Sequence, residues 1–100
     1  MVNGEEETTE NTNPASLSGD SFFKVFPNPT TGNFTLELSS EPDGTLVKVQ
    51  CYNLLGALIM EKEFYTGKLH EFTLVDQKPG LYVLKVQQNA EIGMQKIIRQ

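Results

Sequence analysis

The sequence predicts an all-β fold, an antiparallel β-sandwich of about seven strands. From residue 22 to residue 100, short runs rich in Val, Ile, Leu, Phe and Thr alternate with turn residues. Several runs place apolar and polar residues at alternate positions, as strands with one buried face do. This number of strands in about 80 residues is typical of an immunoglobulin-like sandwich with Greek-key connections. The Cys–Trp–Cys pattern of antibody domains is absent, because the chain has one cysteine and no tryptophan.

The first three expected strands have the clearest boundaries. Residues 22–26 form the first, which ends at Pro27 because proline has no N–H to donate to a neighbouring strand. In the second, residues 33–39, Phe or Leu occupies every second position. The third, residues 46–52, follows a Glu-Pro-Asp-Gly turn and alternates in the same way.

The later strands are less regular. The fourth, residues 57–64, contains a contiguous Leu-Ile-Met run that fits neither face alone. The sixth, residues 81–87, has apolar residues on both faces, which predicts partial cover on both sides. The fifth and seventh are expected over residues 70–74 and 92–99.

Charge is concentrated at the start of the chain. The sequence has eight basic and thirteen acidic residues, a formal charge of −5, and five of the acids but none of the bases lie in residues 1–20. Residues 1–20 are also polar, and such a segment buries too little surface to offset its ordering entropy. We therefore expect a disordered acidic linker over residues 1–20 and one folded, overall neutral domain over residues 21–100.

The composition argues against several functions. Without a basic surplus we expect no nucleic-acid binding, and without a run of about 18 apolar residues we expect no membrane insertion. The first residues do not form a signal-peptide pattern. One cysteine, Cys51, and one histidine, His70, cannot build a four-ligand zinc site. We expect no metal, no cofactor and no enzymatic activity, with Cys51 a small buried side chain and His70 near solvent.

Two local patterns have a structural explanation of their own. The Pro-Asn-Pro-Thr-Thr-Gly string at residues 27–32 fits a rigid connection between strands, with Gly32 supplying a positive φ. Tyr82 stands at the start of a strand after a corner, where a tyrosine corner would bond its hydroxyl back to upstream backbone. The alternative for Tyr82 is an ordinary amphipathic residue at the rim of the core.

Four segments carry a resemblance to a known family. They are residues 23–32 (FKVFPNPTTG), 49–56 (VQCYNLLG), 79–86 (PGLYVLKV) and 96–100 (KIIRQ). In this order and spacing they resemble the C-terminal sorting domains of the type IX (Por) secretion system of Bacteroidetes. Cys51 stands where that family usually has an aliphatic residue. The positions that match the family pattern are Pro27, Asn28, Pro29, Gly32, Tyr52, Asn53, Gly56, Gly80 and Tyr82.

The resemblance implies a targeting function. Such domains direct an upstream cargo protein through the outer-membrane secretion machinery to the cell surface or the medium. A sortase-like peptidase often removes them and joins the cargo to a surface anchor. In this interpretation residues 1–20 connect the cargo to the sorting domain and are accessible to a protease; the alternative is a simple tether. The residues expected to be recognised by the translocon are Lys96, Ile97, Ile98, Arg99 and Gln100.

Other interpretations stay open at this stage. The chain end would either offer an edge for strand addition to a partner or be an ordinary edge strand protected by charge. The rival function is an immunoglobulin-like binding module for carbohydrate or for a neighbouring domain. That module needs an exposed aromatic platform, for which the candidates are Tyr52, Tyr65 and Phe26. A hydrolase has almost no support in this sequence.

Overall fold

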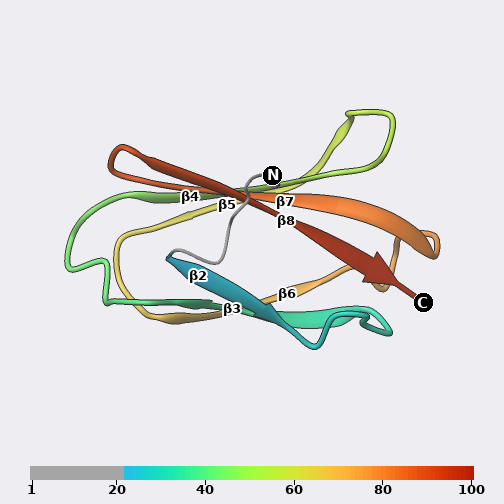
Figure 1. Ribbon diagram of the computed structural model, residues 1–100, viewed down its shortest axis with the longest axis horizontal. Coiled ribbons are helices and arrows are strands. Elements are labelled where there is room, and N and C mark those ends of the chain that lie inside the picture. Colours follow the sequence, from blue (N-terminus) through green and yellow to red (C-terminus); the bar gives the residue numbers. More distant parts are fainter. Residues whose placement is uncertain (1–21) are drawn as a thin grey trace, which may run out of the picture.

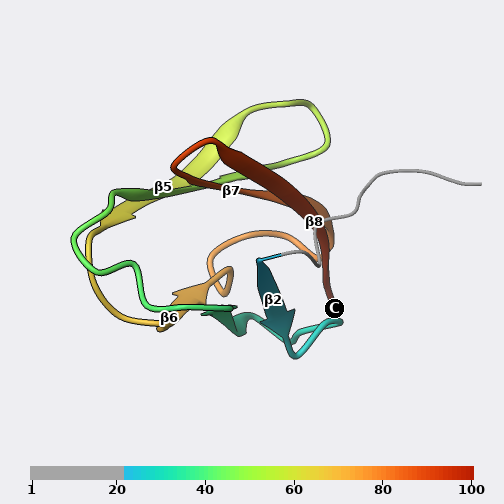
Figure 2. The ribbon, with the colours of Figure 1, turned by 60° about the vertical axis from the view of Figure 1, so that its left-hand side comes forward.

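A computed structural model describes residues 22–100, in which seven strands form two antiparallel sheets packed face to face (Figures 1 and 2). The three-stranded sheet has the order β2-β3-β6, and the four-stranded sheet has the order β5-β4-β7-β8. The predicted β-sandwich is confirmed. The linker expected over residues 1–20 lies outside the described residues. The strands are β2 (Phe23–Phe26), β3 (Asn33–Leu38), β4 (Val47–Tyr52), β5 (Leu58–Phe64), β6 (Leu69–Thr73), β7 (Gly80–Gln88) and β8 (Glu91–Arg99).

Two neighbour pairs join strands that are distant along the chain. β3 pairs with β6, and β4 pairs with β7, so the chain crosses between the sheets in the Greek-key manner. The fourth strand, β5, pairs with β4 in the four-stranded sheet. In a constant-type immunoglobulin domain the fourth strand lies instead beside the fifth. No helix in residues 22–100 is long and apolar enough to cross a membrane.

The core lies between the sheets and follows the alternation of the sequence. β3, β4 and β7 bury every second side chain, and the residues between them face outward. β8 adds a single large apolar side chain, Ile97, which is opposite Tyr82. Burial of these apolar faces is the main stabilising term of the fold. The buried set from the three alternating strands is Phe34, Leu36, Leu38, Val47, Val49, Cys51, Tyr82, Leu84 and Val86.

A β-bulge explains the irregular fourth run. The pairing of β4 with β5 shifts between Cys51 and Tyr52: Cys51 lies opposite Met60, whereas Tyr52 lies opposite Leu58. Ile59 is therefore the extra residue on the bulged strand, and it packs partly against the core. Ile59 and Met60, which are neighbours in the sequence, can thus both pack against the core, while Leu58 stays exposed.

Cys51 is a buried, unreactive thiol. Its side chain is fully buried, and burial raises the pKa of the thiol to about 11. Because only the thiolate reacts with alkylating agents, we expect iodoacetamide at pH 8 to leave Cys51 unmodified in the native protein. In denaturant, where the pKa of the thiol returns to about 8.5, alkylation should be complete. Mass spectrometry measures both, and equal alkylation rates in the two states would contradict the burial of this side chain.

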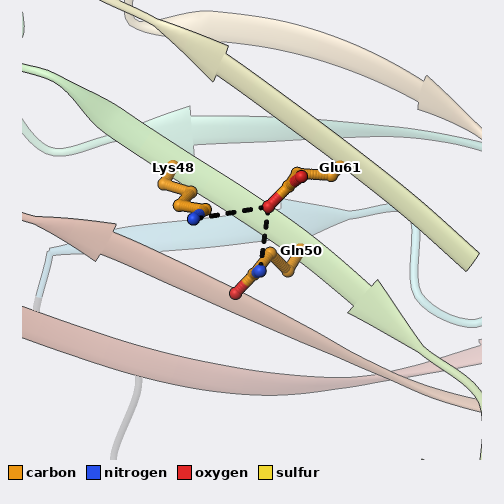
Figure 3. A network of polar contacts seen from close by, with 3 residues as sticks. All are labelled: Lys48, Gln50 and Glu61. Carbon is orange, nitrogen blue, oxygen red and sulfur yellow. Dashed lines mark hydrogen bonds and ion pairs between the residues drawn. The ribbon is translucent and has the colours of Figure 1, made fainter. Parts of the chain in front are cut away.

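Polar contacts on the outer surface contribute less than the core. On the four-stranded sheet, Lys48 Nζ lies 3.5 Å from Glu61 Oε2, and Gln50 Nε2 donates to the same oxygen at 2.9 Å (Figure 3). Lys24 and Glu37 form a similar pair at 3.8 Å on the other sheet. Exposed pairs of this kind contribute about 0–1 kcal/mol each, so the fold depends chiefly on its buried faces.

Candidate functional site

Each of the four segments that carry the family pattern has residues at one end of the sandwich, which we call the junction end (Figure 1). It comprises the turn of residues 27–32, the β4–β5 hairpin turn of residues 53–57, the connector of residues 74–80 and the last residues of β8. Pairing of the strands places them together: Tyr52 is opposite Val83, and Gly80 is opposite Arg99. Segments up to 70 residues apart in the sequence therefore form one continuous region.

The turn of residues 27–32 runs parallel to the end of β8. The Thr30 N–H donates to Ile98 O, and the Gln100 N–H donates to Thr30 O, both at 2.8 Å. Thr30 is only 1% exposed, and its hydroxyl donates to Asn33 O at 2.5 Å and accepts from the Gly32 N–H at 3.0 Å. Sequence reasoning missed Thr30. A threonine two residues before a turn glycine was the available signal.

The Asn28 side chain extends this ladder. Its Nδ2 donates to Lys96 O at 2.6 Å, and its Oδ1 accepts from the Ile98 N–H at 2.9 Å. A primary amide offers a donor and an acceptor, as a peptide group does. Asn28 therefore occupies the place of one more paired residue along β8. The peptide bonds before Pro27 and Pro29 are both cis.

Arg99 joins the third segment to this end of β8. Its Nε donates to Leu74 O at 3.0 Å, its Nη2 donates to Val75 O at 3.3 Å, and its Nη1 donates to Gln100 O. The Leu74 N–H in turn donates to Gly32 O at 2.8 Å. The guanidinium of Arg99 is thus engaged by backbone carbonyls and holds the connector after β6 against the end of β8.

The five residues expected to be recognised divide into two groups. Ile97 is fully buried and Arg99 is half-buried, so both hold the strand in place. Lys96, Ile98 and Gln100 are exposed. The edge of β8 in this region is not free for strand addition, because Asn28 and Thr30 occupy it.

The tyrosine corner is present. Tyr82 is buried, and its hydroxyl donates to Lys78 O, four residues upstream, at 2.5 Å. We expect Tyr82→Phe to lower the free energy of unfolding by about 1–2 kcal/mol, because it removes a hydrogen bond and leaves a carbonyl unpaired. Urea denaturation measures the loss. Tyr52→Phe is the control, because Tyr52 is a half-exposed residue on the outer face of β4, and equal losses in the two variants would contradict this assignment.

The residues of the rival binding module do not gather. Tyr52 faces outward from β4 at the junction end, Phe26 belongs to the other sheet, and Tyr65 follows β5 at the far end. His70, in β6, is half-buried, stacked on Phe64 with ring centroids 3.4 Å apart and with Nε2 donating to Gly67 O at 2.8 Å. Within residues 22–100, no three His, Cys, Asp or Glu side chains are grouped as metal ligands.

Comparison with known proteins agrees with the resemblance carried by these segments. Residues 24–100 match the family described as "Secretion system C-terminal sorting domain". Over 65 residues the chain is 34% identical to Ulvan lyase NLR42 of Nonlabens ulvanivorans, a match that covers 65% of this chain and 12% of that protein. The chain therefore belongs to the C-terminal sorting domains of the type IX secretion system, the signals that direct proteins to the cell surface or the extracellular space.

Proposed function

We propose that the junction end is the surface by which this domain is recognised, and that the domain carries an upstream protein across the outer membrane without catalysis of its own. The observation that supports this most is the separation of the two ends. Residues of all four family segments surround the last residues of the chain, whereas the chain enters β2, at the start of the first of these segments, at Phe23, opposite Leu38, at the other end of β3. The proposed recognition surface thus points away from the position where cargo attaches.

Within the junction end we assign recognition to the exposed side chains of Lys96, Ile98 and Gln100. Ile97 and Arg99 act as positioning residues, because the first packs in the core and the second binds backbone carbonyls. Lys96 supplies a positive charge and Ile98 supplies apolar surface, the combination that an acidic and partly apolar partner site would bind.

We further propose that a sortase-like peptidase removes the domain by cutting upstream of Phe22. A peptidase requires an accessible backbone, and the sandwich begins at this residue. The Phe22 carbonyl accepts from the Ser39 N–H at 2.8 Å, and the side chains of Phe22 and Phe23 are buried. The cut is therefore expected within residues 1–21 or in the cargo that precedes them.

Export of a reporter tests the proposed function. The full chain is fused to the C-terminus of an inert periplasmic reporter in a host with a type IX system and in the same host without its translocon. We expect surface or extracellular reporter only in the first host, and N-terminal sequencing of any released tail to begin at or before Phe22. Periplasmic retention in the competent host would contradict the proposed function, and a cut beyond Phe22 would contradict the assigned cleavage region.

A further inference from the structure

The β4–β5 hairpin exposes two adjacent leucines at its tip. Leu54 is 68% exposed and Leu55 is 93% exposed, and Leu58, where β5 begins, is 48% exposed. A single exposed leucine is common on protein surfaces. Neighbouring ones at the tip of a projecting hairpin form an apolar knob, which is the kind of feature that marks an interaction site.

Hydrogen bonds fix the shape of this tip. Asn53 Oδ1 accepts from the Leu55 N–H at 2.9 Å and from the Ala57 N–H at 3.0 Å. The Asn53 N–H donates to Ala57 O, and the Gly56 N–H donates to Asn53 O, both at 3.0 Å. Gly56 takes a φ of +85°, which favours glycine. The turn that carries the leucines is thus already ordered in the free domain, so its backbone loses little conformational entropy when a partner binds.

The knob is continuous with the residues that the proposed function assigns to recognition. Leu58 is opposite Tyr52, and Tyr52 is opposite Val83, on the outer face of the four-stranded sheet. On the same face of β7, two residues before Val83, Leu81 is opposite Ile98. An apolar strip therefore crosses all four strands from the hairpin to Ile98. Both views show the hairpin rising from the outer side of this sheet (Figures 1 and 2).

The chemistry of the knob favours a protein pocket over a lipid surface. Two leucine side chains carry fewer apolar carbons than a myristoyl group, which by itself gives only marginal membrane binding. Residues 53–57 (NLLGA) contain no lysine or arginine to attract anionic headgroups. A pocket, in contrast, gains from the fixed shape of the tip, because a well-packed and fully desolvated side chain contributes most to a protein interface.

We propose that Leu55, with Leu54 beside it, inserts into an apolar pocket of a type IX secretion component when the same component binds the exposed residues of the chain end. This inference rests on the proposed function and extends its recognition surface over the outer face of the four-stranded sheet. Leu55 is the anchor side chain, and the strip from Leu58 to Ile98 is the flanking contact.

Serine substitutions of the tip test this inference in the full chain fused to the periplasmic reporter. We expect Leu55→Ser, and more strongly Leu54→Ser combined with Leu55→Ser, to reduce exported reporter about tenfold or more. The melting temperature should not change, because the side chains lie outside the core. The matched control is Leu69→Ser, since Leu69 is 61% exposed at the start of β6 in the other sheet, and we expect wild-type export from it.

The outcomes separate the two proposals. Wild-type export from the tip variants, together with export of the unmodified fusion, would overturn the role of the knob and leave the proposed function standing. Retention of the unmodified fusion would overturn the proposed function itself. Leu55-dependent sedimentation of the chain with vesicles of anionic phospholipid would assign the knob to a membrane and overturn the protein-pocket assignment.

Discussion

Replacing Ile97 by alanine is expected to lower the free energy of unfolding by about 2–5 kcal/mol. The side chain is fully buried opposite Tyr82, so its truncation removes apolar contacts and leaves a cavity between the sheets. Lys96→Ala, one residue earlier, should cost less than about 0.5 kcal/mol because that side chain is exposed. Two adjacent residues, both expected from the sequence to be recognised, should thus behave in opposite ways.

Urea denaturation of the purified chain measures both variants. Similar losses for Ile97→Ala and Lys96→Ala would show that the end of β8 is not packed as described.

Deletion of residues 96–100 has a broader effect, because it removes Ile97 from the core together with the hydrogen bonds to Asn28, Thr30 and Leu74. Loss of export after that deletion would report unfolding as well as lost recognition, so point substitutions of exposed residues are the sharper test.

Replacing Gly32 by alanine is expected to lower the free energy of unfolding by about 2–4 kcal/mol, for two reasons that add. Gly32 has a φ of +149°, a conformation that residues with a side chain rarely adopt. A Cβ at this position would also lie 2.6 Å from Val75 Cγ1, in the connector that Arg99 holds. Thermal or urea denaturation measures the effect.

The double variant Gly32→Ala with Val75→Ala separates the two causes. Removing Cγ1 of Val75 relieves the steric part and leaves the backbone part, so the double variant should be more stable than Gly32→Ala and less stable than the wild type. Val75→Ala alone should cost little, because Val75 is exposed. A neutral Gly32→Ala would contradict the close packing of the turn against the connector.

The strands were predictable from the sequence because their physical cause is local. Period-two alternation in β3, β4 and β7 determined which side chains are buried, and each predicted strand boundary lies within one residue of the observed one. The tyrosine corner was foreseeable for the same reason, since its hydrogen bond spans four residues. The pairing of β5 with β4 was not predicted, because alternation shows which face is buried and not which neighbour a strand takes.

The contacts that hold the junction end depend on tertiary structure. Nothing local to Asn28 indicates that its amide pairs with a strand 68 residues later. The charge of Arg99 suggested an exposed recognition residue, whereas its guanidinium binds the carbonyls of Leu74 and Val75. The sequence resemblance identified the four segments, but only the sandwich topology shows that residues of all four meet at one end of the domain.

Recognition through the exposed chain end is tested most directly by export of the Lys96→Glu, Ile98→Ser double variant fused to the reporter. Both side chains are exposed at the junction end, so the chain should stay folded, as near-unchanged far-UV circular dichroism and Cys51 protection would verify. The matched control is Lys68→Glu with Ile92→Ser, the same changes at exposed positions of the far end. We predict periplasmic retention of the first variant and wild-type export of the second; equal export of the two would contradict recognition at the junction end.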